Sequence, residues 1–286
     1  MTQKRTRLFV IVDPTATHQV ALVKALLIAK LADCEIHAFL CVYRDVDKSE
    51  AALSSHDLKH QTIIDAEKWL GKQLEACEIA GVAFSREVVW NSKWYDAALR
   101  SIAKSGCDMV IKSSFHHSKS KRFYNATSDY SLMRHCVCPI LFAHQTQEWK
   151  SDRVLACVDL ESTDPKHARL NGVIIRDAQA LANIVGMELY VAAAYNVGID
   201  TENLPIKGHG QQVNLEQLGQ LYGVDESRII LRQGSTIATL KHICEELDPS
   251  IVIMGTLARA GISGKLIGNT AEKLLDVIDA DLLTVN

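Results

Sequence analysis

The segments RLFVIVDP, residues 7–14, and RVLACVDL, residues 153–160, have the same pattern and begin the two halves of the chain. In each, a short apolar run follows an arginine and ends at an aspartate, Asp13 or Asp159. A polar turn, a helical pattern and a second apolar run come next, at residues 35–43 in one half and 188–195 in the other. The chain therefore starts the same structural unit twice, which indicates an internal duplication.

The repeat continues through the rest of both halves. Residues 86–90 align with 228–232, 109–114 with 251–256, and 139–142 with 281–284, always 142 positions apart. Near the two starts the separation is 146, so one small length difference lies in the middle of the halves. The polar segment QTQEWKSD at residues 145–152 separates them, and we place the domains at residues 1–148 and 149–286.

Each half reads as five short strands that alternate with helices. Apolar runs of four to eight residues, rich in Val and Ile, are typical of strands buried on both faces. Their alternation with helical patterns predicts a parallel sheet with right-handed crossovers. We therefore expect an α/β fold made of two tandem Rossmann-like domains, each a five-stranded parallel sheet flanked by helices. In the middle region we expect one helix over residues 49–80, with Ile64 on its buried face. A loop and a helix over residues 212–222 are expected in the second half.

The bulk composition excludes several classes of protein. The net charge of −3 gives no field that would attract nucleic acid or acidic lipid. The first apolar run is ended by Asp13 and Pro14, so it is no secretory signal, and no run reaches the roughly 20 residues of a membrane helix. Eight cysteines, several inside apolar runs, are typical of reduced and buried thiols. We expect a cytoplasmic protein with neither a membrane nor a nucleic-acid partner.

The most chemically specific segment is GTLARAGISGKLIGNTAE at residues 255–272. Its glycines allow a sharp turn, and the N–H groups that open the following helix favour an anion such as phosphate. This segment resembles the nucleotide-binding signature of the universal stress protein family, which is Gly, two residues, Gly, nine residues, Gly and then Ser or Thr. The resemblance covers almost the whole chain twice, as in the tandem two-domain members. It implies the strand order 3-2-1-4-5 in each half.

Both halves depart from the family signature. In the second half Gly255 and Gly268 match it, whereas Ala258 and Asn269 do not, and Thr270 follows one position late. The first half has lost all three glycines, which are replaced by Ser113, His116 and Ala126. Added Cβ atoms obstruct a close approach of the backbone to phosphate, so we predict no ATP binding through the first loop. If one half holds a nucleotide, the second is expected to do so.

In a sheet of this order, ligands bind at the carboxyl ends of the first and fourth strands, where the connections diverge. The expected site of the second half consists of Asp159, Leu160, Ala192, Gly255, Thr256, Arg259, Gly268, Asn269 and Thr270. The equivalent positions of the first half are Asp13, Pro14, Ser113, Ser114 and Ser128, together with residues of the basic loop that begins at Lys112. Two plainer interpretations stay open: each aspartate caps the turn after its strand, and the glycine loop is a tight connection without a ligand.

We interpret the remaining histidine, lysine and cysteine clusters as structural or surface features without a ligand. We interpret His116 and His117, with the neighbouring Lys112, as a solvated polar loop. Cys136 and Cys138 have no second cluster at a zinc-site spacing, so we expect no metal there. His56 and His60, one helical turn apart, are expected to be surface residues. No signature of a hydrolase triad or a carboxylate pair is visible, and the chain is interpreted as a non-enzyme.

The resemblance implies a stress-response protein that acts by binding a ligand or a partner, with a role in resistance to DNA-damaging agents. The ligand would be ATP or another small molecule in the second half. One alternative is a weak ATPase that uses the Gly255 loop. Another is a carrier of an apolar molecule beside residues 192–194, whose alanines equally suit close helix packing. We expect the halves to form an intramolecular pseudo-dimer near residues 139–144 and 281–286, and we favour homodimerisation of the chain.

Overall fold

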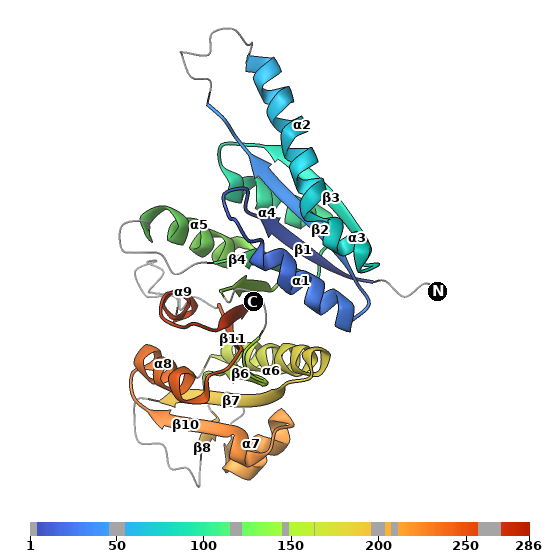
Figure 1. Cartoon of the computed structure of the whole chain (residues 1–286). Coiled ribbons are helices and arrows are strands. Elements are labelled where there is room, and N and C mark those ends of the chain that lie inside the picture. Colours follow the sequence, from blue (N-terminus) through green and yellow to red (C-terminus); the bar gives the residue numbers. More distant parts are fainter. Residues whose placement is uncertain are drawn as a thin grey trace. The chain divides into compact units, whose positions relative to one another are not determined.

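The computed structural model describes residues 5–45, 55–114, 122–144, 149–162, 164–195, 204–206, 211–256 and 270–286. The chain divides into two compact units, residues 1–147 and 148–286. Each unit is an α/β domain built on a five-stranded parallel sheet, as the alternation of strand and helix patterns predicts (Figure 1).

The first unit has the strand order β3-β2-β1-β4-β5, with every neighbouring pair parallel. Its strands are β1 (Thr6–Val12), β2 (Cys34–Val42), β3 (Phe84–Trp90), β4 (Met109–Ser113) and β5 (Ile140–Ala143). Its helices are α1 (Val20–Leu31), α2 (Ser55–Gln73), α3 (Glu75–Ile79), α4 (Trp94–Ser105) and α5 (Arg122–His135).

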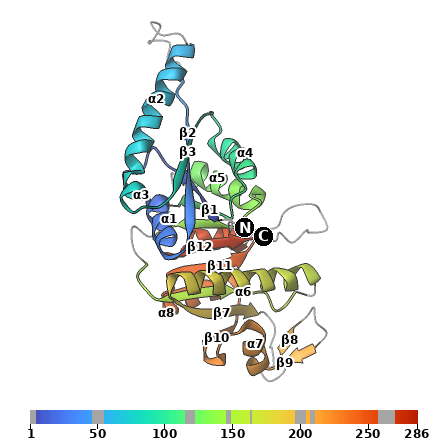
Figure 2. The ribbon, with the colours of Figure 1, turned by 90° about the vertical axis from the view of Figure 1, so that its right-hand side faces the viewer.

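Helices cover both faces of this sheet. Figure 2 shows α1, α2 and α3 on one side of the strands and α4 and α5 on the other. Phe9 and Val10 on the central strand β1 are completely buried, as are Ala38 and Phe39 beside them on β2. Successive strand residues point to opposite faces, so a run in which every residue is buried needs cover on both sides.

The second unit repeats this order as β10-β7-β6-β11-β12, again with parallel neighbours. Its strands are β6 (Arg153–Cys157), β7 (Glu188–Tyr195), β10 (Ile229–Gln233), β11 (Ile251–Gly255) and β12 (Asp281–Val285). Its helices are α6 (Pro165–Val185), α7 (Leu215–Tyr222), α8 (Thr236–Leu247) and α9 (Thr270–Leu275), with a 3-10 turn at Glu226–Arg228.

The duplication extends to individual hydrogen bonds. The guanidinium of Arg7 donates to the Ser105 carbonyl at 2.6 Å, and Arg153 donates in the same way to the Leu247 carbonyl at 2.8 Å. Ser105 and Leu247 are separated by the 142 positions found in the sequence. Each arginine therefore ties the start of a first strand to the end of the helix that precedes a fourth strand, and the same long-range link is built twice.

The units differ in the middle region, where two sequence expectations need correction. The helix expected over residues 49–80 is divided into α2 and α3, its first residues lie outside the described part, and Ile64 is exposed rather than buried. In the second unit an antiparallel pair, β8 (Leu204–Ile206) and β9 (Gln211–Val213), occupies part of the expected loop. The following helix α7 starts at Leu215, because Asn214 and Gln217 form a capping box there.

Candidate functional site

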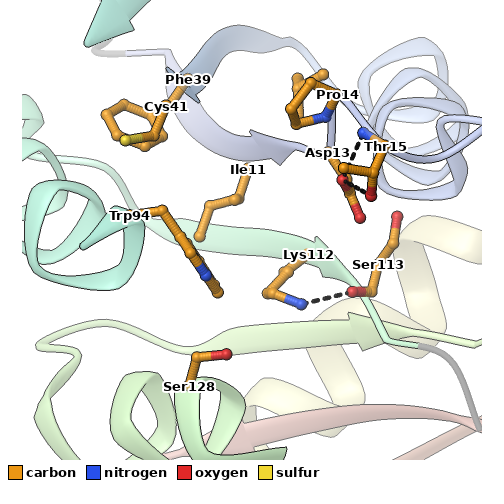
Figure 3. Close-up of a pocket in the computed structure, with 11 residues that line it drawn as sticks. Ile11, Asp13, Pro14, Thr15, Phe39, Cys41, Trp94, Lys112, Ser113 and Ser128 are labelled. Atoms are coloured by element: carbon orange, nitrogen blue, oxygen red, sulfur yellow. Dashed lines mark hydrogen bonds between the residues drawn. The ribbon is translucent and has the colours of Figure 1, made fainter. Parts of the chain in front are cut away.

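A pocket of about 300 Å³ lies in the first unit at the carboxyl ends of β1 and β4 (Figure 3). This is the position at which the connections leave the sheet in opposite directions, since α1 follows β1 toward β2 and α5 follows β4 toward β5. The lining residues come from β1, the turn after it, β2, α4, β4 and α5. They are Ile11, Val12, Asp13, Pro14, Thr15, Phe39, Cys41, Trp94, Lys112, Ser113 and Ser128.

Much of the pocket wall is apolar. Ile11 and Phe39 come from adjacent strands, and Trp94, the first residue of α4, faces the space in front of them (Figure 3). Phe39 is buried in the core, whereas Trp94 and Cys41 are only partly covered. Aromatic rings at the edge of a cavity offer a large flat contact area at little entropic cost.

Among the residues that the structure describes, Lys112 is the cation that lines the pocket, and it is neutralised within the protein. Lys112 Nζ lies 2.8 Å from Asp129 Oδ1, and both side chains are largely buried, with exposed fractions of 15% and 4%. The same ammonium donates to the Ser113 carbonyl at 2.8 Å and lies 5.4 Å from the centre of the Trp94 ring. The Ser114 hydroxyl donates to the other oxygen of Asp129 at 3.1 Å. Lys112 is thus part of β4 and of a buried ion pair, not of a solvated loop as the sequence suggested.

Asp13 shapes the turn that closes one side of the pocket. Its Oδ1 accepts from the backbone N–H of Thr15 at 2.8 Å and from the Thr15 hydroxyl at 2.7 Å. The Gln19 amide donates to the Asp13 carbonyl at 2.7 Å and accepts from the Asp13 N–H at 3.2 Å. The geometry therefore matches the plainer interpretation of this aspartate, which is a strand-terminating residue that caps the following turn.

Ser113 occupies the position of the first family glycine and uses its side chain structurally. The Ser113 hydroxyl oxygen accepts from the backbone N–H of Ala21 at 3.0 Å, in the first turn of α1. Gln19 precedes the helix but makes no side-chain capping bond. Ser113 therefore satisfies an N–H that a bound anion would otherwise compete for.

In the second unit, the expected site residues divide into three groups. Asp159, Leu160, Ala192, Gly255 and Thr256 lie at the carboxyl edge of the adjacent strands β7, β6 and β11. Thr270 begins α9, a helix of six residues. Arg259, Gly268 and Asn269 lie outside the described residues, as do His116 and His117 of the first half.

The oxygens of Asp159 are already engaged. Oδ1 accepts from the N–H groups of Glu161 and Ser162 at 3.0 and 3.1 Å, and Oδ2 lies 3.2 Å from His167 Nδ1. Thr256 uses its hydroxyl at the end of β12, where it contacts the Val285 carbonyl at 3.3 Å and the Asn286 side chain. These polar groups therefore already have hydrogen-bond partners within the unit, where they stabilise the edge of the sheet.

Gly255 is required by packing inside the unit. A Cβ built on Gly255 would overlap the Leu170 side chain of α6, with Leu170 Cγ only 2.7 Å away. Gly255 therefore allows β11 to approach α6 closely. The sequence had instead attributed this glycine to a loop that binds a ligand. The alanines of β7 have a similar explanation: Ala192 and Ala193 are buried and α8 packs on this strand, so the packing of a helix accounts for them.

The carboxyl edges of the sheets in the first and second units correspond position by position. The register pairs Arg7 with Glu35 in the first unit and Arg153 with Glu188 in the second, so β2 and β7 are offset by 188 − 35 = 153 positions. The halves therefore differ in length both before and after the second strand, and the single difference expected from the sequence is wrong. Phe39 then corresponds to Ala192, while Ser113 and Ser128 correspond to Gly255 and Thr270 at the offset of 142. Asp13, Pro14, Ser113 and Ser128, four of the five positions expected in the first half, line its pocket. The fifth, Ser114, is buried against Asp129.

Sequence reasoning missed Phe39 and Trp94 as lining residues, and it expected Lys112 there only as one of the basic loop residues. Trp94 could have been found, because it opens the helix that leads into the fourth strand. His56 and His60 of α2 were expected to be surface residues, and both are exposed. Their rings are stacked, with centroids 6.4 Å apart. Among the residues the structure describes, no helix is long and apolar enough to cross a membrane.

The model of the universal stress protein family matches residues 4–144 and again residues 151–286. The chain belongs to this family. It is 27% identical to universal stress protein E of Photorhabdus laumondii and 26% identical to that of Escherichia coli K12. These alignments cover 97% of this chain and 94% and 93% of the two relatives.

Solved structures support the same fold. A putative universal stress protein from Pseudomonas aeruginosa matches 98% of this chain and 93% of its own, with a TM-score of 0.77 and 24% identity. A universal stress protein from Archaeoglobus fulgidus matches 98% of both chains, with a TM-score of 0.72 and 14% identity. The family resemblance stated from the sequence and the expected α/β class are therefore confirmed.

Proposed function

We propose that the protein acts in the stress response by binding a small ligand in the pocket of its first unit, without turning over a substrate. The observation that carries the proposal is the pocket of about 300 Å³ at the carboxyl ends of β1 and β4. Open α/β sheets bind ligands at this place, and a cavity of this size lies within the usual range of ligand sites.

The walls indicate the class of ligand. Ile11, Phe39 and Trp94 supply apolar surface, and the charge of Lys112 is compensated by Asp129. A highly charged ligand would have to compete with this internal ion pair, and Ser113 already occupies an N–H of α1. These contacts favour a compact, largely apolar molecule with a few hydrogen-bonding groups over a nucleoside triphosphate.

For the second unit we propose a separate and weak nucleotide site. It comprises Asp159, Leu160, Ala192, Gly255, Thr256, Arg259, Gly268, Asn269 and Thr270, with ATP as the expected ligand. Two of the family's glycines, Gly255 and Gly268, support the assignment. The engaged oxygens of Asp159 and the packing role of Gly255 support a low affinity.

The absence of turnover is proposed on chemical grounds. A general base needs a free lone pair directed at its substrate. Asp13 Oδ1 is bonded to the Thr15 turn, and both oxygens of Asp159 have partners within their own unit. These carboxylates are better suited to holding turns than to moving protons.

In the cell we propose a cytoplasmic role that includes resistance to DNA-damaging agents, exerted through this binding. We also propose that the chain forms a homodimer, which light scattering tests: a constant mass near the 31.6 kDa of one chain would contradict it.

The cellular role can be tested with one pair of variants in a strain that lacks the gene. Cys41→Trp places a large ring in the pocket, whereas Cys41→Ala introduces the residue found at the equivalent position of the second unit, Ala194. Cells are exposed to ultraviolet light or to a DNA cross-linking agent, and survival is counted. The proposal predicts that Cys41→Ala restores survival like the wild type and that Cys41→Trp does not. Equal restoration by both variants, at equal protein levels, would contradict it.

A further inference from the structure

Three cysteines that are distant in sequence come together at the amino ends of β4 and β5. Cys107 Sγ lies 3.4 Å from Cys138 Sγ, and Cys138 Sγ lies 3.7 Å from Cys136 Sγ. Cys107 follows α4 on the turn that leads into β4, and the other two lie between α5 and β5. Sequence spacing could not reveal this cluster, because Cys107 and Cys138 are 31 positions apart.

The fold does not need sulfur at these positions. The second unit has Pro249, Ile278 and Ala280 at the positions equivalent to Cys107, Cys136 and Cys138, 142 residues later. Ile278 and Ala280 are buried there, so ordinary apolar side chains fill the same space in an equivalent fold. The three thiols are therefore a chemical feature that the first unit alone possesses.

We propose that Cys107 and Cys138 form a reversible disulfide when the protein meets a peroxide, which makes this cluster an oxidant-sensitive site. The proposal goes beyond ligand binding and does not depend on it. A disulfide needs a sulfur separation of about 2.05 Å, so the two atoms must approach by roughly 1.4 Å. Both cysteines lie on turns, and Cys107 directly follows Gly106, whose φ is 60°. Neither one has to distort the middle of a strand.

The environment of the cluster favours reaction at Cys107. The hydrogen bond with Cys138, together with one involving Ser105, lowers the pKa of the Cys107 thiol to about 7 despite its partial burial. The same contact raises the pKa of Cys138. Cys107 is also partly exposed, whereas Cys136 and Cys138 are buried. A partly exposed thiol with a pKa near the ambient pH is the best attacking group.

The cysteines outside the cluster provide an internal contrast, whereas contact with Cys138 also lowers the pKa of the buried Cys136. Burial raises the pKa of Cys34, Cys77 and Cys157, and it raises that of Cys244 to about 12. These thiols stay protonated near neutrality and behave as small apolar groups. Among the described residues, no group of three or more His, Cys, Asp or Glu side chains is arranged to hold a metal ion, which favours thiol oxidation over metal binding.

The chemistry balances with a hydroperoxide as the oxidant. The Cys107 thiolate attacks one peroxide oxygen; the S–O bond forms, the O–O bond breaks, and with hydrogen peroxide the leaving hydroxide becomes water after taking up a proton. The Cys138 sulfur then attacks the sulfenic acid of Cys107, so that the S–S bond forms and the S–O bond breaks. The hydroxyl leaves as a second water with the proton of Cys138. The two thiols lose two electrons, the peroxide gains them, and a dithiol reductant reverses the bridge.

The bridge would close a segment that also carries part of the pocket. Lys112, Ser113 and Ser128 all lie between the two cysteines in sequence. Oxidation at one end of β4 would therefore restrain the segment that forms the pocket wall at its other end.

The test uses the full chain, reduced with dithiothreitol, freed of reductant and treated with a few equivalents of hydrogen peroxide at pH 7. Free thiols are then blocked with N-ethylmaleimide, and tryptic peptides are analysed by mass spectrometry. Trypsin separates residues 105–112, which contain Cys107, from residues 135–150, which contain Cys136 and Cys138. We expect these two peptides to be linked after peroxide and to separate again after dithiothreitol.

Variants assign the bridge to one pair. Cys138→Ala introduces the residue present at the equivalent position of the second unit; it should abolish the link and leave Cys107 as a sulfenic acid that dimedone traps. Cys136→Ala and the control Cys244→Ala should keep the link. No linked peptide in the wild type, or a link that persists in Cys138→Ala, would overturn the proposal. The wild-type measurement alone decides whether the disulfide forms, so the proposal can be tested even if a variant fails to fold.

Discussion

The buried pair of Lys112 and Asp129 allows a sharp prediction, because the duplication supplies its apolar counterpart. At the equivalent positions, 142 residues later, the second unit has Met254 and Ala271, both buried in the same fold. We therefore consider the single variant Asp129→Ala and the double variant Lys112→Met with Asp129→Ala. The single change leaves the ammonium of Lys112, whose side chain is only 15% exposed, without its carboxylate.

The expected magnitude follows from the cost of an unpaired buried charge. Removing one partner of a buried ion pair destabilises a protein by about 3–5 kcal/mol, whereas replacing both by well-packed apolar residues is often neutral or stabilising. We take about 3 kcal/mol for Asp129→Ala, since Lys112 keeps its bond to the Ser113 carbonyl and a partly open pocket beside it. With a urea m-value of about 2 kcal/mol/M, that corresponds to a midpoint lower by roughly 1.5 M.

The assay is urea unfolding of the full chain followed by tryptophan fluorescence. Three of the four tryptophans, Trp69, Trp90 and Trp94, belong to the first unit, so the signal reports mainly on the unit that is changed. The double variant should recover most of the lost stability. If the double variant is as unstable as Asp129→Ala, or if Asp129→Ala unfolds like the wild type, the reasoning about this pair is wrong.

Three further predictions follow from other contacts. The rate of iodoacetamide labelling at Cys107 should rise with pH around a midpoint near pH 7. In Cys138→Ala this midpoint should move to higher pH, because the variant lacks the thiol that is the main cause of the lowered pKa. An unchanged midpoint would contradict this. Below that midpoint the thiolate is protonated and the labelling rate falls. Gly255→Ala should destabilise the protein by about 1–3 kcal/mol in thermal or urea unfolding, since its Cβ overlaps Leu170, and Leu170→Val should recover part of the loss; a neutral Gly255→Ala would refute the packing role. ATP should bind the wild type only in the millimolar range by calorimetry, and Ala258→Gly with Asn269→Ser should improve the affinity about tenfold to a hundredfold; no improvement would count against the second-unit site.

Local patterns were sufficient to predict the fold class and its duplication, but not the order of the strands. Apolar runs such as LFVIV at residues 8–12 predict strands buried on both faces, and the repeated spacing predicts that they occur twice. The order of strands came from the family resemblance, because alternation alone is compatible with more than one order. The middle helix was misjudged in two respects. It is divided into α2 and α3, and the side chain of Ile64 is exposed to solvent.

The sites were predicted less completely, for a physical reason. Asp13 and Ser113 could be placed at the pocket because they end strands, and strand ends meet at one edge of a parallel sheet. The partner of Lys112 is 17 positions away on another element, so a lysine beside a basic loop was interpreted as solvated when it is ion-paired. Cys107 was overlooked for the same reason. Gly255 fits both a ligand loop and close packing, and only its distance from Leu170 shows that packing requires it.

Native mass spectrometry of the intact chain can show whether the pocket of the first unit holds a ligand. The protein is purified from cells without added ligand, sprayed under non-denaturing conditions and then unfolded, so that any released molecule can be identified. We expect the wild type and Cys41→Ala to carry a compact, largely apolar molecule and Cys41→Trp to carry none. A wild type that carries no molecule, or a ligand that Cys41→Trp retains in full, would contradict the assignment of the first-unit pocket as the binding site.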